Sequence, residues 1–309
     1  MEKDSLIYVA GHEDFVGSAI VRRLKEVGYN NLLLPGSFSL TDQRETMEFF
    51  KKESPEYVFL VAEKVGGILA NKTYPADFIY QNLIIQTNVI HSAYLSGVKK
   101  LLFPGSSCSY PKMCPQPIKE EYLLSGHLES TNEAYAVAKI AGIKMCQAYN
   151  KQYGTNYLSV IPANLYGTND DFDPESSHVL PALIRRFHEA KMTKVKNIAI
   201  WGSGKPRREF LYVDDFADAS IFLMNNYNNS QTINIGTGED ISIGKLATIV
   251  KEIVGFEGKI VYDQTKPDGM PRKLLDVSHI NALGWRARTS LEEGIKITYN
   301  WYKELGLNQ

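Results

Sequence analysis

The sequence predicts an α/β protein in which a doubly wound parallel sheet is followed by a smaller α/β domain. Short apolar runs alternate with longer segments of helical periodicity through the first half of the chain, which is the pattern of βαβ units. The runs are apolar throughout, as strands covered on both faces are. After about Pro162 the rhythm of the segments changes. Together these observations favour a Rossmann-like N-terminal part and a second, smaller C-terminal α/β domain.

The first half is expected to consist of strands that alternate with helices. The predicted strands cover residues 7–10, 31–34, 57–61, 100–103 and 157–161. The predicted helices cover residues 16–27, 43–53, 76–95 and 133–153. Pro75 suits the first turn of the third helix, where the missing N–H costs no intrahelical hydrogen bond.

The second half has a less regular pattern. Residues 169–177 are expected to form an acidic, polar loop. Helices are predicted at 179–190, 214–225, 243–254 and 291–303, and strands at 198–201, 232–235 and 260–262. We therefore expect a dinucleotide-binding domain over residues 1–168, to which part of 210–240 returns, and a mainly substrate-binding domain over 169–309.

The composition excludes several classes of protein. The chain has 309 residues, a net charge of −1 and no basic block, so we expect no nucleic acid partner. No apolar run approaches the roughly 20 residues that span a bilayer, and the N-terminus enters a predicted strand without a signal peptide. The three cysteines are an odd and low count, which points to a reducing compartment, the cytoplasm. No Cys/His spacing suggests a metal site.

Tyr135 and Lys139 are the most informative pair in the sequence. They lie one turn apart on the predicted helix 133–153 and therefore face the same side. An ammonium beside a phenol favours the phenolate and lowers the tyrosine pKa. The hydroxyl of Ser106, just after the strand at 100–103, could bind the carbonyl that the tyrosine protonates. This pattern predicts an acid–base device for moving a hydride to or from a carbonyl carbon.

The same spacing occurs twice more in the chain. Tyr262 and Lys266 lie at a strand end and in the loop that follows, so their spacing carries no meaning. Tyr299 and Lys303 lie on an amphipathic C-terminal helix, where a packing tyrosine and a surface lysine are the simpler interpretation. The position of Tyr135 behind Ser106 therefore separates it from the other two.

The loop after the first strand is the predicted place for a dinucleotide pyrophosphate. Glycine lets the backbone approach phosphates, and the following helix N-terminus supplies N–H groups and a partial positive charge. Its residues are Gly11, His12, Glu13, Asp14, Phe15, Val16 and Gly17. A Gly-x-x-Gly-x-x-Gly pattern would need glycine at position 14, where Asp14 stands instead. The alternative is a solvated acidic turn, because aspartate is favourable near a helix N-terminus.

The end of the second strand normally selects between NAD and NADP. An acid there binds ribose hydroxyls, whereas arginine or lysine accepts a 2′-phosphate. The chain has Pro35, Gly36 and Ser37 at this place, with neither kind of residue. The preference between NADP(H) and NAD(H) stays open on these residues.

The glycine loop, Ser106 and the Tyr135/Lys139 pair together resemble the extended short-chain dehydrogenase/reductase family. Further stretches are similar to the GDP-L-fucose synthases of that family: 64–68, 71–79, 105–108, 164–167, 177–190, 201–204, 208–211 and 266–269. The resemblance spans nearly the whole chain. It implies conversion of GDP-4-keto-6-deoxy-D-mannose to GDP-L-fucose, by epimerisation at C3 and C5 and then reduction of the C4 ketone with NADPH.

The resemblance assigns roles to individual side chains. Epimerisation beside a ketone needs a base and an acid, and these are the roles of Cys108 and His178. In the reduction, Tyr135 would protonate the C4 alkoxide, Lys139 would lower the tyrosine pKa and hold the nicotinamide ribose, and Ser106 would orient the carbonyl.

The resemblance also implies ligand-binding residues. The cofactor would contact the loop at 11–17 and, further along, Lys139, Pro162, Ala163, Asn164, Leu165 and His178. The GDP-sugar would contact Arg186, Trp201, Arg208 and Asp268. The two arginines suit a pyrophosphate, because a guanidinium donates in a bidentate fork.

The departures from the family pattern cluster on the cofactor side. Asp14 replaces a glycine, and Glu13 stands where many members have arginine. Glu63 replaces a small apolar residue near the expected nicotinamide ribose. Three alternatives stay open: a working enzyme with weakened or altered nicotinamide use, a cofactor-impaired sugar-binding protein or epimerase, and an enzyme of a related nucleotide sugar. The resemblance implies a homodimer through the helices at 76–95 and 133–153.

Overall fold

The computed structural model of the protein describes residues 1–36, 38–174, 176–265 and 268–306. Its centre is a parallel sheet with the strand order β10-β5-β4-β3-β1-β2. The strands are β1 (Ile7–Ala10), β2 (Leu32–Leu33), β3 (Tyr57–Leu60), β4 (Lys100–Pro104), β5 (Tyr157–Pro162) and β10 (Ile233–Ile235). From β1 the chain steps to β2 on one side and then to β3 on the other. The carboxyl ends of β1 and β3 therefore form a topological switch point, where ligands bind in such sheets.

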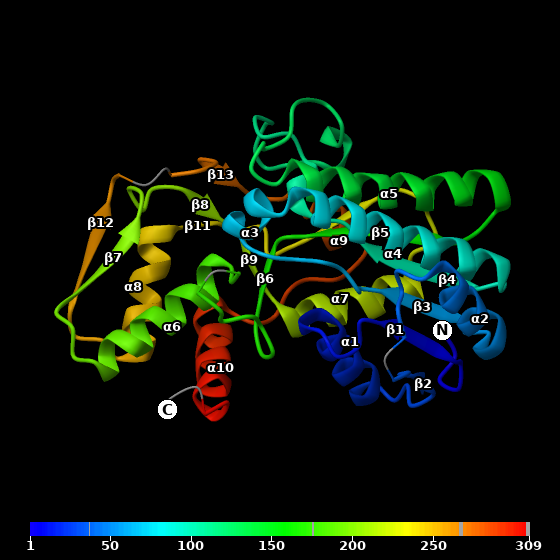
Figure 1. Cartoon of the computed structure of the whole chain (residues 1–309), viewed down its shortest axis with the longest axis horizontal. Coiled ribbons are helices and arrows are strands. Elements are labelled where there is room, and N and C mark those ends of the chain that lie inside the picture. Colours follow the sequence, from blue (N-terminus) through cyan, green and yellow to red (C-terminus); the bar gives the residue numbers. More distant parts are fainter. Residues whose placement is uncertain (37, 175, 266–267, 307–309) are drawn as a thin grey trace.

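Helices cover both faces of this sheet (Figure 1). One face carries α2 (Gln43–Glu53), α4 (Pro75–Leu95) and α5 (Glu133–Tyr153), which pack against one another. The other face carries α1 (Phe15–Glu26) and α7 (Val213–Asn226). The doubly wound arrangement that the sequence predicts is therefore confirmed. Short helices lie in the connections, namely α3 (Ile68–Thr73), η1 (Ser107–Ser109) and η2 (Glu120–Tyr122).

The later segments build a smaller α/β region beside this sheet (Figure 1). The short helix α9 (Ser278–Ala282) packs beside β10 of the large sheet, whereas the helices of the smaller region are α6 (Val179–Met192), α8 (Ile243–Val254) and α10 (Leu291–Glu304). Its strands are β6 (Asn164–Tyr166), β7 (Asn197–Trp201), β8 (Arg207–Arg208), β9 (Phe210–Tyr212), β11 (Ile241–Ser242), β12 (Lys259–Asp263) and β13 (Arg272–Lys273). They pair as β11-β8-β13, β12-β7 and β6-β9. A second apolar core, with Phe187 and Ile295 fully buried, fills the space between α6, α8 and α10.

The predicted long elements agree with the structure to within about two residues. The helices predicted at 43–53, 133–153 and 243–254 have those bounds, and α4 begins at Pro75. The sequence interpretation missed β6, β8, β9, β11 and β13, which have two or three residues each and are too short to show a period. In the described part of the chain no helix is long and apolar enough to cross a membrane.

Candidate functional site

Two glycines shape the loop between β1 and α1. Gly11 has a φ of +87°, and a Cβ there would lie 2.8 Å from the backbone of Ala62, which follows β3. A Cβ on Gly17 would lie 1.9 Å from the carbonyl oxygen of Gly11. Glycine at both positions lets the loop fold closely against the first turn of α1. This is the backbone shape that receives a pyrophosphate at a switch point.

Asp14 places a carboxylate at the N-terminus of α1. It is the N-cap residue, and its side chain is exposed and makes no capping hydrogen bond. Partial desolvation, followed by the nearby carboxylates of Glu63 and Glu13, raises the pKa of Asp14. The side chain of Glu13 is 88% exposed and lies 3.8 Å from His12. The loop therefore has the shape for a pyrophosphate but carries the wrong sign of charge.

Tyr135 and Lys139 share an acceptor that comes from the loop after β3. The Oε2 atom of Glu63 lies 2.6 Å from Nζ of Lys139 and accepts a hydrogen bond of 2.9 Å from the Tyr135 hydroxyl. Lys139 also donates to the carbonyl oxygen of Pro104 at 2.9 Å. Both side chains of the pair are buried. The structure thus brings the predicted pair together and adds a carboxylate between its polar ends.

The pKa of Tyr135 is raised well above its usual value. Burial is the largest cause, and Glu63 and Cys108 add to it, whereas a hydrogen bond with Ser106 lowers the pKa. The spacing with Lys139 alone leads to the opposite expectation. The difference arises because the phenol is buried and because Glu63 pairs with the ammonium and accepts a hydrogen bond from the phenol.

Cys108 lies next to two hydrogen-bond donors. Its Sγ accepts from Nδ2 of Asn132 at 3.0 Å and from Nζ of Lys273 at 3.6 Å. The Oγ of Ser106 accepts from the backbone N–H of Cys108 at 3.2 Å, which fixes the serine beside the thiol. The sequence interpretation missed Asn132 and Lys273. Lys273 lies on the two-residue strand β13, whose position depends on its pairing with β8.

His178 is the N-cap residue of α6. The residue reaches solvent, yet many protein atoms surround its ring, and this desolvation lowers its pKa. Glu63 and Asp171 oppose this by raising the pKa, and Lys273 lowers it further. Because Glu63 contacts Tyr135 and Lys273 contacts Cys108, His178 belongs to the same electrostatic group as these two residues.

The residues after β5 form one edge of the site. Pro162 ends β5, and the N–H of Ala163 donates to the last carbonyl of β10 at 2.8 Å. The Nδ2 of Asn164 donates to the carbonyl oxygen of Glu209 at 2.7 Å, and Leu165 lies on β6. These positions share the carboxyl end of the sheet with the glycine loop, as the sequence predicts for cofactor contacts.

Glu209 fixes the strand that carries Lys273. The Glu209 carboxylate is buried and accepts from the backbone N–H groups of Gly238 at 2.7 Å and Leu275 at 2.8 Å. Its own N–H donates to the carbonyl oxygen of Lys273 at 3.3 Å. Burial raises the pKa of Glu209 to about 7, although these hydrogen bonds act in the other direction.

The four residues expected to bind the sugar nucleotide lie in the smaller region. Arg208 donates to the carbonyl oxygen of Met270 at 2.6 Å; burial lowers the pKa of its guanidinium, and Cys108 opposes this shift. Asp268 accepts from the N–H of Ser203 at 2.6 Å, which holds the turn after the exposed Trp201.

Arg186 anchors on the neighbouring strand. It donates to the carbonyl oxygen of Ala199 on β7, two residues before Trp201. Burial lowers the pKa of this arginine. Lys266, which belongs to both the second Tyr/Lys spacing and the stretch at 266–269, lies outside the described residues, as do Pro267 and Ser37.

The third Tyr/Lys spacing has a packing role. The hydroxyl of Tyr299 shares a 2.9 Å hydrogen bond with the buried His188, and Nζ of Lys303 lies 5.0 Å from the centre of the Tyr299 ring. This environment fits the simpler interpretation of a packing tyrosine and a surface lysine.

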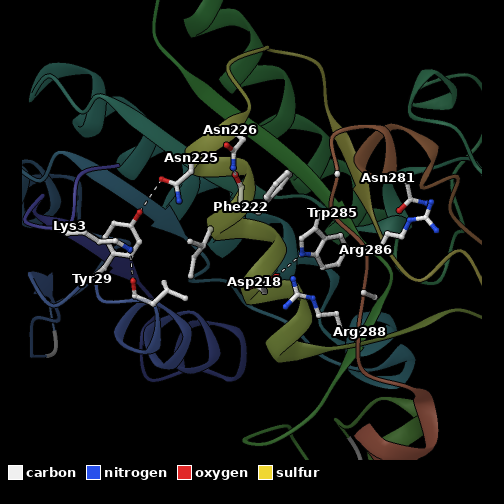
Figure 2. Close-up of a pocket in the computed structure, with 14 residues that line it drawn as sticks. Lys3, Tyr29, Asp218, Phe222, Asn225, Asn226, Asn281, Trp285, Arg286 and Arg288 are labelled. Atoms are coloured by element: carbon white, nitrogen blue, oxygen red, sulfur yellow. Dashed lines mark hydrogen bonds between the residues drawn. The ribbon is translucent and has the colours of Figure 1, made fainter.

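A shallow groove of about 570 Å³ lies between the N-terminus, α7 and the segment after α9 (Figure 2). Some of its lining side chains contact one another: Asp218 accepts from Nε1 of Trp285 at 2.8 Å, and Lys3 lies over the ring of Tyr29. No predicted site residue is among the described residues that line it. Within the described chain, no group of three or more His, Cys, Asp or Glu side chains could hold a metal ion.

The fold and these side chains agree with a known protein family. A model described as the NAD dependent epimerase/dehydratase family matches residues 7–236, from β1 through β10. The chain belongs to this family. The matched part contains the glycine loop, the Tyr135–Lys139 pair and most of the residues expected to bind the sugar nucleotide.

Relatives within the family are similar over almost the full chain. The sequence is 58% identical to GDP-L-fucose synthase 1 of Arabidopsis thaliana, over 97% of this chain and 94% of that protein. It is 52% identical to the GDP-L-fucose synthase of Escherichia coli, over 96% of each chain.

Solved structures in the family superpose closely. A GDP-6-OMe-4-keto-L-xylo-heptose reductase of Campylobacter jejuni has a TM-score of 0.94 and 43% identity, over 99% of both chains. A GDP-L-fucose synthetase of Naegleria fowleri bound to NADP has a TM-score of 0.91 and 30% identity, over 98% of this chain and 95% of that one.

The backbone of the glycine loop has the shape that a nicotinamide dinucleotide needs, but the side chains beside it do not supply the positive charge. The glycine cradle, the α1 N-terminus and the buried Tyr135–Lys139 pair are in place. Residues 34–36 and 38–42, the described chain after β2, contain no cationic side chain for a 2′-phosphate. Family membership supports use of NAD(P)H.

Proposed function

We propose that this protein is a GDP-L-fucose synthase, which epimerises GDP-4-keto-6-deoxy-D-mannose at C3 and C5 and then reduces its C4 ketone. The observation that carries the proposal is the close grouping of a reduction pair, Tyr135 with Lys139, and an epimerisation thiol, Cys108. The identity of 52–58% to GDP-L-fucose synthases over nearly the whole chain supports it.

In the epimerisation, Cys108 takes a proton from a carbon next to the ketone, and His178 returns one on the other face. The ketone acidifies these C–H bonds. Asn132 and Lys273 donate hydrogen bonds to the sulfur and would stabilise the negative charge of a thiolate that acts as the base. Glu63 and Asp171 keep His178 closer to a protonated form by raising its pKa against the effect of burial.

In the reduction, Tyr135 gives its proton to the oxygen at C4, and Ser106 holds that oxygen by a hydrogen bond. The bound nicotinamide supplies the hydride. Lys139 positions the phenol through the acceptor that both side chains share. We propose NADP(H) as the cofactor from the resemblance, with NAD(H) as the alternative, because no described residue after β2 offers a cation.

We assign the nucleotide part of the substrate to the smaller region, residues 169–309, and the cofactor to residues 1–168 together with part of 210–240. Arg186 and Arg208 would bind the pyrophosphate in bidentate fashion. Trp201 has an exposed ring that could contact the nucleotide, and Asp268 holds the turn that follows it.

We also propose a homodimer in a reducing compartment, the cytoplasm. The described cysteines are free, which suits that compartment. Large apolar side chains are exposed on α4 and α5, where a second copy could cover them; examples are Tyr80, Leu95 and Tyr153.

A second candidate is an epimerase or GDP-sugar-binding protein with impaired cofactor binding. Two observations favour it: the carboxylate of Asp14 at the helix end and the ion pair between Glu63 and Lys139 at the expected ribose position.

One experiment separates the candidates. The protein is titrated with NADPH and with NADH, and the keto-sugar is then supplied in D₂O while nicotinamide absorbance and deuterium at C3 and C5 are followed. Deuterium incorporation with oxidation of either nucleotide supports the synthase. Deuterium incorporation without saturable binding of either nucleotide supports the epimerase, and neither signal with tight sugar binding leaves only a binding protein.

A further inference from the structure

Glu63 is a charged residue for which the acid–base scheme has no role. It follows β3 at the switch point, and one of its oxygens contacts both members of the Tyr135–Lys139 pair. We propose that Glu63 is a positioning residue that locks this pair together and keeps Tyr135 in its protonated, proton-donating form. The consequence for catalysis rests on the proposed function, whereas the contact itself does not.

Short contacts hold the Lys139 ammonium and the Tyr135 hydroxyl against Glu63. The Lys139 side chain is 4% exposed, and an ammonium buried to this degree needs acceptors. It has two, the carbonyl oxygen of Pro104 at 2.9 Å and Oε2 of Glu63 at 2.6 Å. Since the same Oε2 accepts from Tyr135 at 2.9 Å, the phenol and the ammonium are held against one atom. Movement of Glu63 would release both side chains.

Burial is the largest factor that favours the neutral phenol, and the charge of Glu63 adds to it. Lys139 alone would favour the phenolate, because an opposite charge stabilises it. The carboxylate of Glu63 offsets that charge and accepts a hydrogen bond from the hydroxyl, and both effects favour the neutral phenol. The direction of the Tyr135 pKa, well above its usual value, agrees with this balance.

Other titratable groups face this contact from neighbouring elements. Cys108 on η1 raises the pKa of Tyr135. Glu63 in turn raises the pKa values of Asp14 on α1 and His178 at the start of α6. Removing the charge of Glu63 therefore alters several groups at once. A pH–rate profile alone would not identify Tyr135, so the test needs a direct signal from the phenol.

Tyrosinate absorbance in the ultraviolet gives that signal without cofactor or substrate. The Glu63→Gln variant keeps the shape and an acceptor oxygen but removes the charge. One tyrosine should then ionise about one to three pH units lower than in the wild type. That step should be missing from the Glu63→Gln/Tyr135→Phe double variant. Glu56→Gln is the matched control, because Glu56 pairs with Lys99 at the other end of β3, and its titration should follow the wild type.

Superimposable titrations of the wild type and Glu63→Gln would overturn the proposal, as would a new step that survives in the double variant. If the protein reduces the keto-sugar, the alkaline limb of kcat should move to lower pH in Glu63→Gln by a similar shift. Reduction with an unmoved phenol titration would refute the role of Glu63 and leave the proposed function intact. A shifted phenol in a protein that reduces no keto-sugar would refute the proposed function alone.

Discussion

Replacement of Asp14 by glycine is expected to tighten NADPH binding about tenfold. A carboxylate and a phosphate about 5 Å apart repel by roughly 3 kcal/mol at an effective dielectric near 20, which is about a hundredfold in affinity. Because Asp14 is exposed, solvent and salt screen about half of this energy, and about 1.4 kcal/mol or tenfold remains. The substitution should cost little stability, since the side chain makes no capping hydrogen bond.

Calorimetric titration with NADPH at low and high salt measures this effect. The Asp14→Asn variant keeps the size and removes the charge, so it should recover most of the gain, and the gain should shrink at high salt. Glu13→Gln is a control, because the Glu13 side chain is 88% exposed and should change affinity less than twofold. Unchanged affinity in both Asp14 variants would show that the carboxylate points away from the phosphates. A gain in the glycine variant alone would assign the effect to size.

Three further outcomes are expected. Cys108→Ser should slow deuterium exchange at C3 and C5 by about a hundredfold or more and leave NADPH affinity within twofold, whereas equal losses would refute its role. Gly17→Ala should cost about 1–3 kcal/mol in urea unfolding and weaken NADPH binding, since its Cβ would lie 1.9 Å from the Gly11 carbonyl oxygen; Gly36→Ala, which meets nothing within 4 Å, should cost less than half as much. Because the pKa of Glu209 is raised to about 7, the folded state binds more protons than the unfolded state, and the wild type should lose stability as pH rises from about 4.5 to 7. The Glu209→Gln variant should remove up to about 3 kcal/mol of this loss. Parallel curves of unfolding free energy against pH for the two proteins would contradict this expectation.

Sequence periodicity was sufficient for the parts of the fold that repeat. The helices α4 and α5 have 21 residues each, long enough for their pattern to appear, and Pro75 marks the start of the first. The strand β13 has only two residues, and its place depends on pairing with β8, in which Lys273 lies opposite Arg208, 65 positions earlier in the sequence. No local pattern encodes such a pairing, so Lys273 could not be predicted beside Cys108.

The candidate site shows the same division. Tyr135 and Lys139 are one helical turn apart, and their common face follows from the helix alone. Glu63 stands out in the sequence as an unusual residue before Lys64, but its contact with Lys139 joins residues 76 positions apart. Burial and that contact together raise the Tyr135 pKa, against the direction that the spacing with Lys139 predicts. Electrostatic predictions from sequence therefore fail where a tertiary partner neutralises the charge that the spacing supplies.

The carboxylates of Asp14 and Glu63 should affect different properties of the candidate site, namely cofactor affinity and the acidity of Tyr135. Asp14 lies at the N-terminus of α1, where its charge opposes a phosphate and therefore alters affinity. Glu63 lies against Lys139 and Tyr135, where its charge alters the strength of an acid. Removal of the Asp14 charge should change NADPH affinity and its salt dependence, and removal of the Glu63 charge should change the phenol titration. Because Glu63 also raises the pKa of Asp14, the two effects are coupled through one weak electrostatic link. The unusual charges therefore lie on the cofactor side of the site, whereas the groups that we propose for proton transfer to the sugar, Tyr135 and Cys108, are the residues that the family resemblance implies.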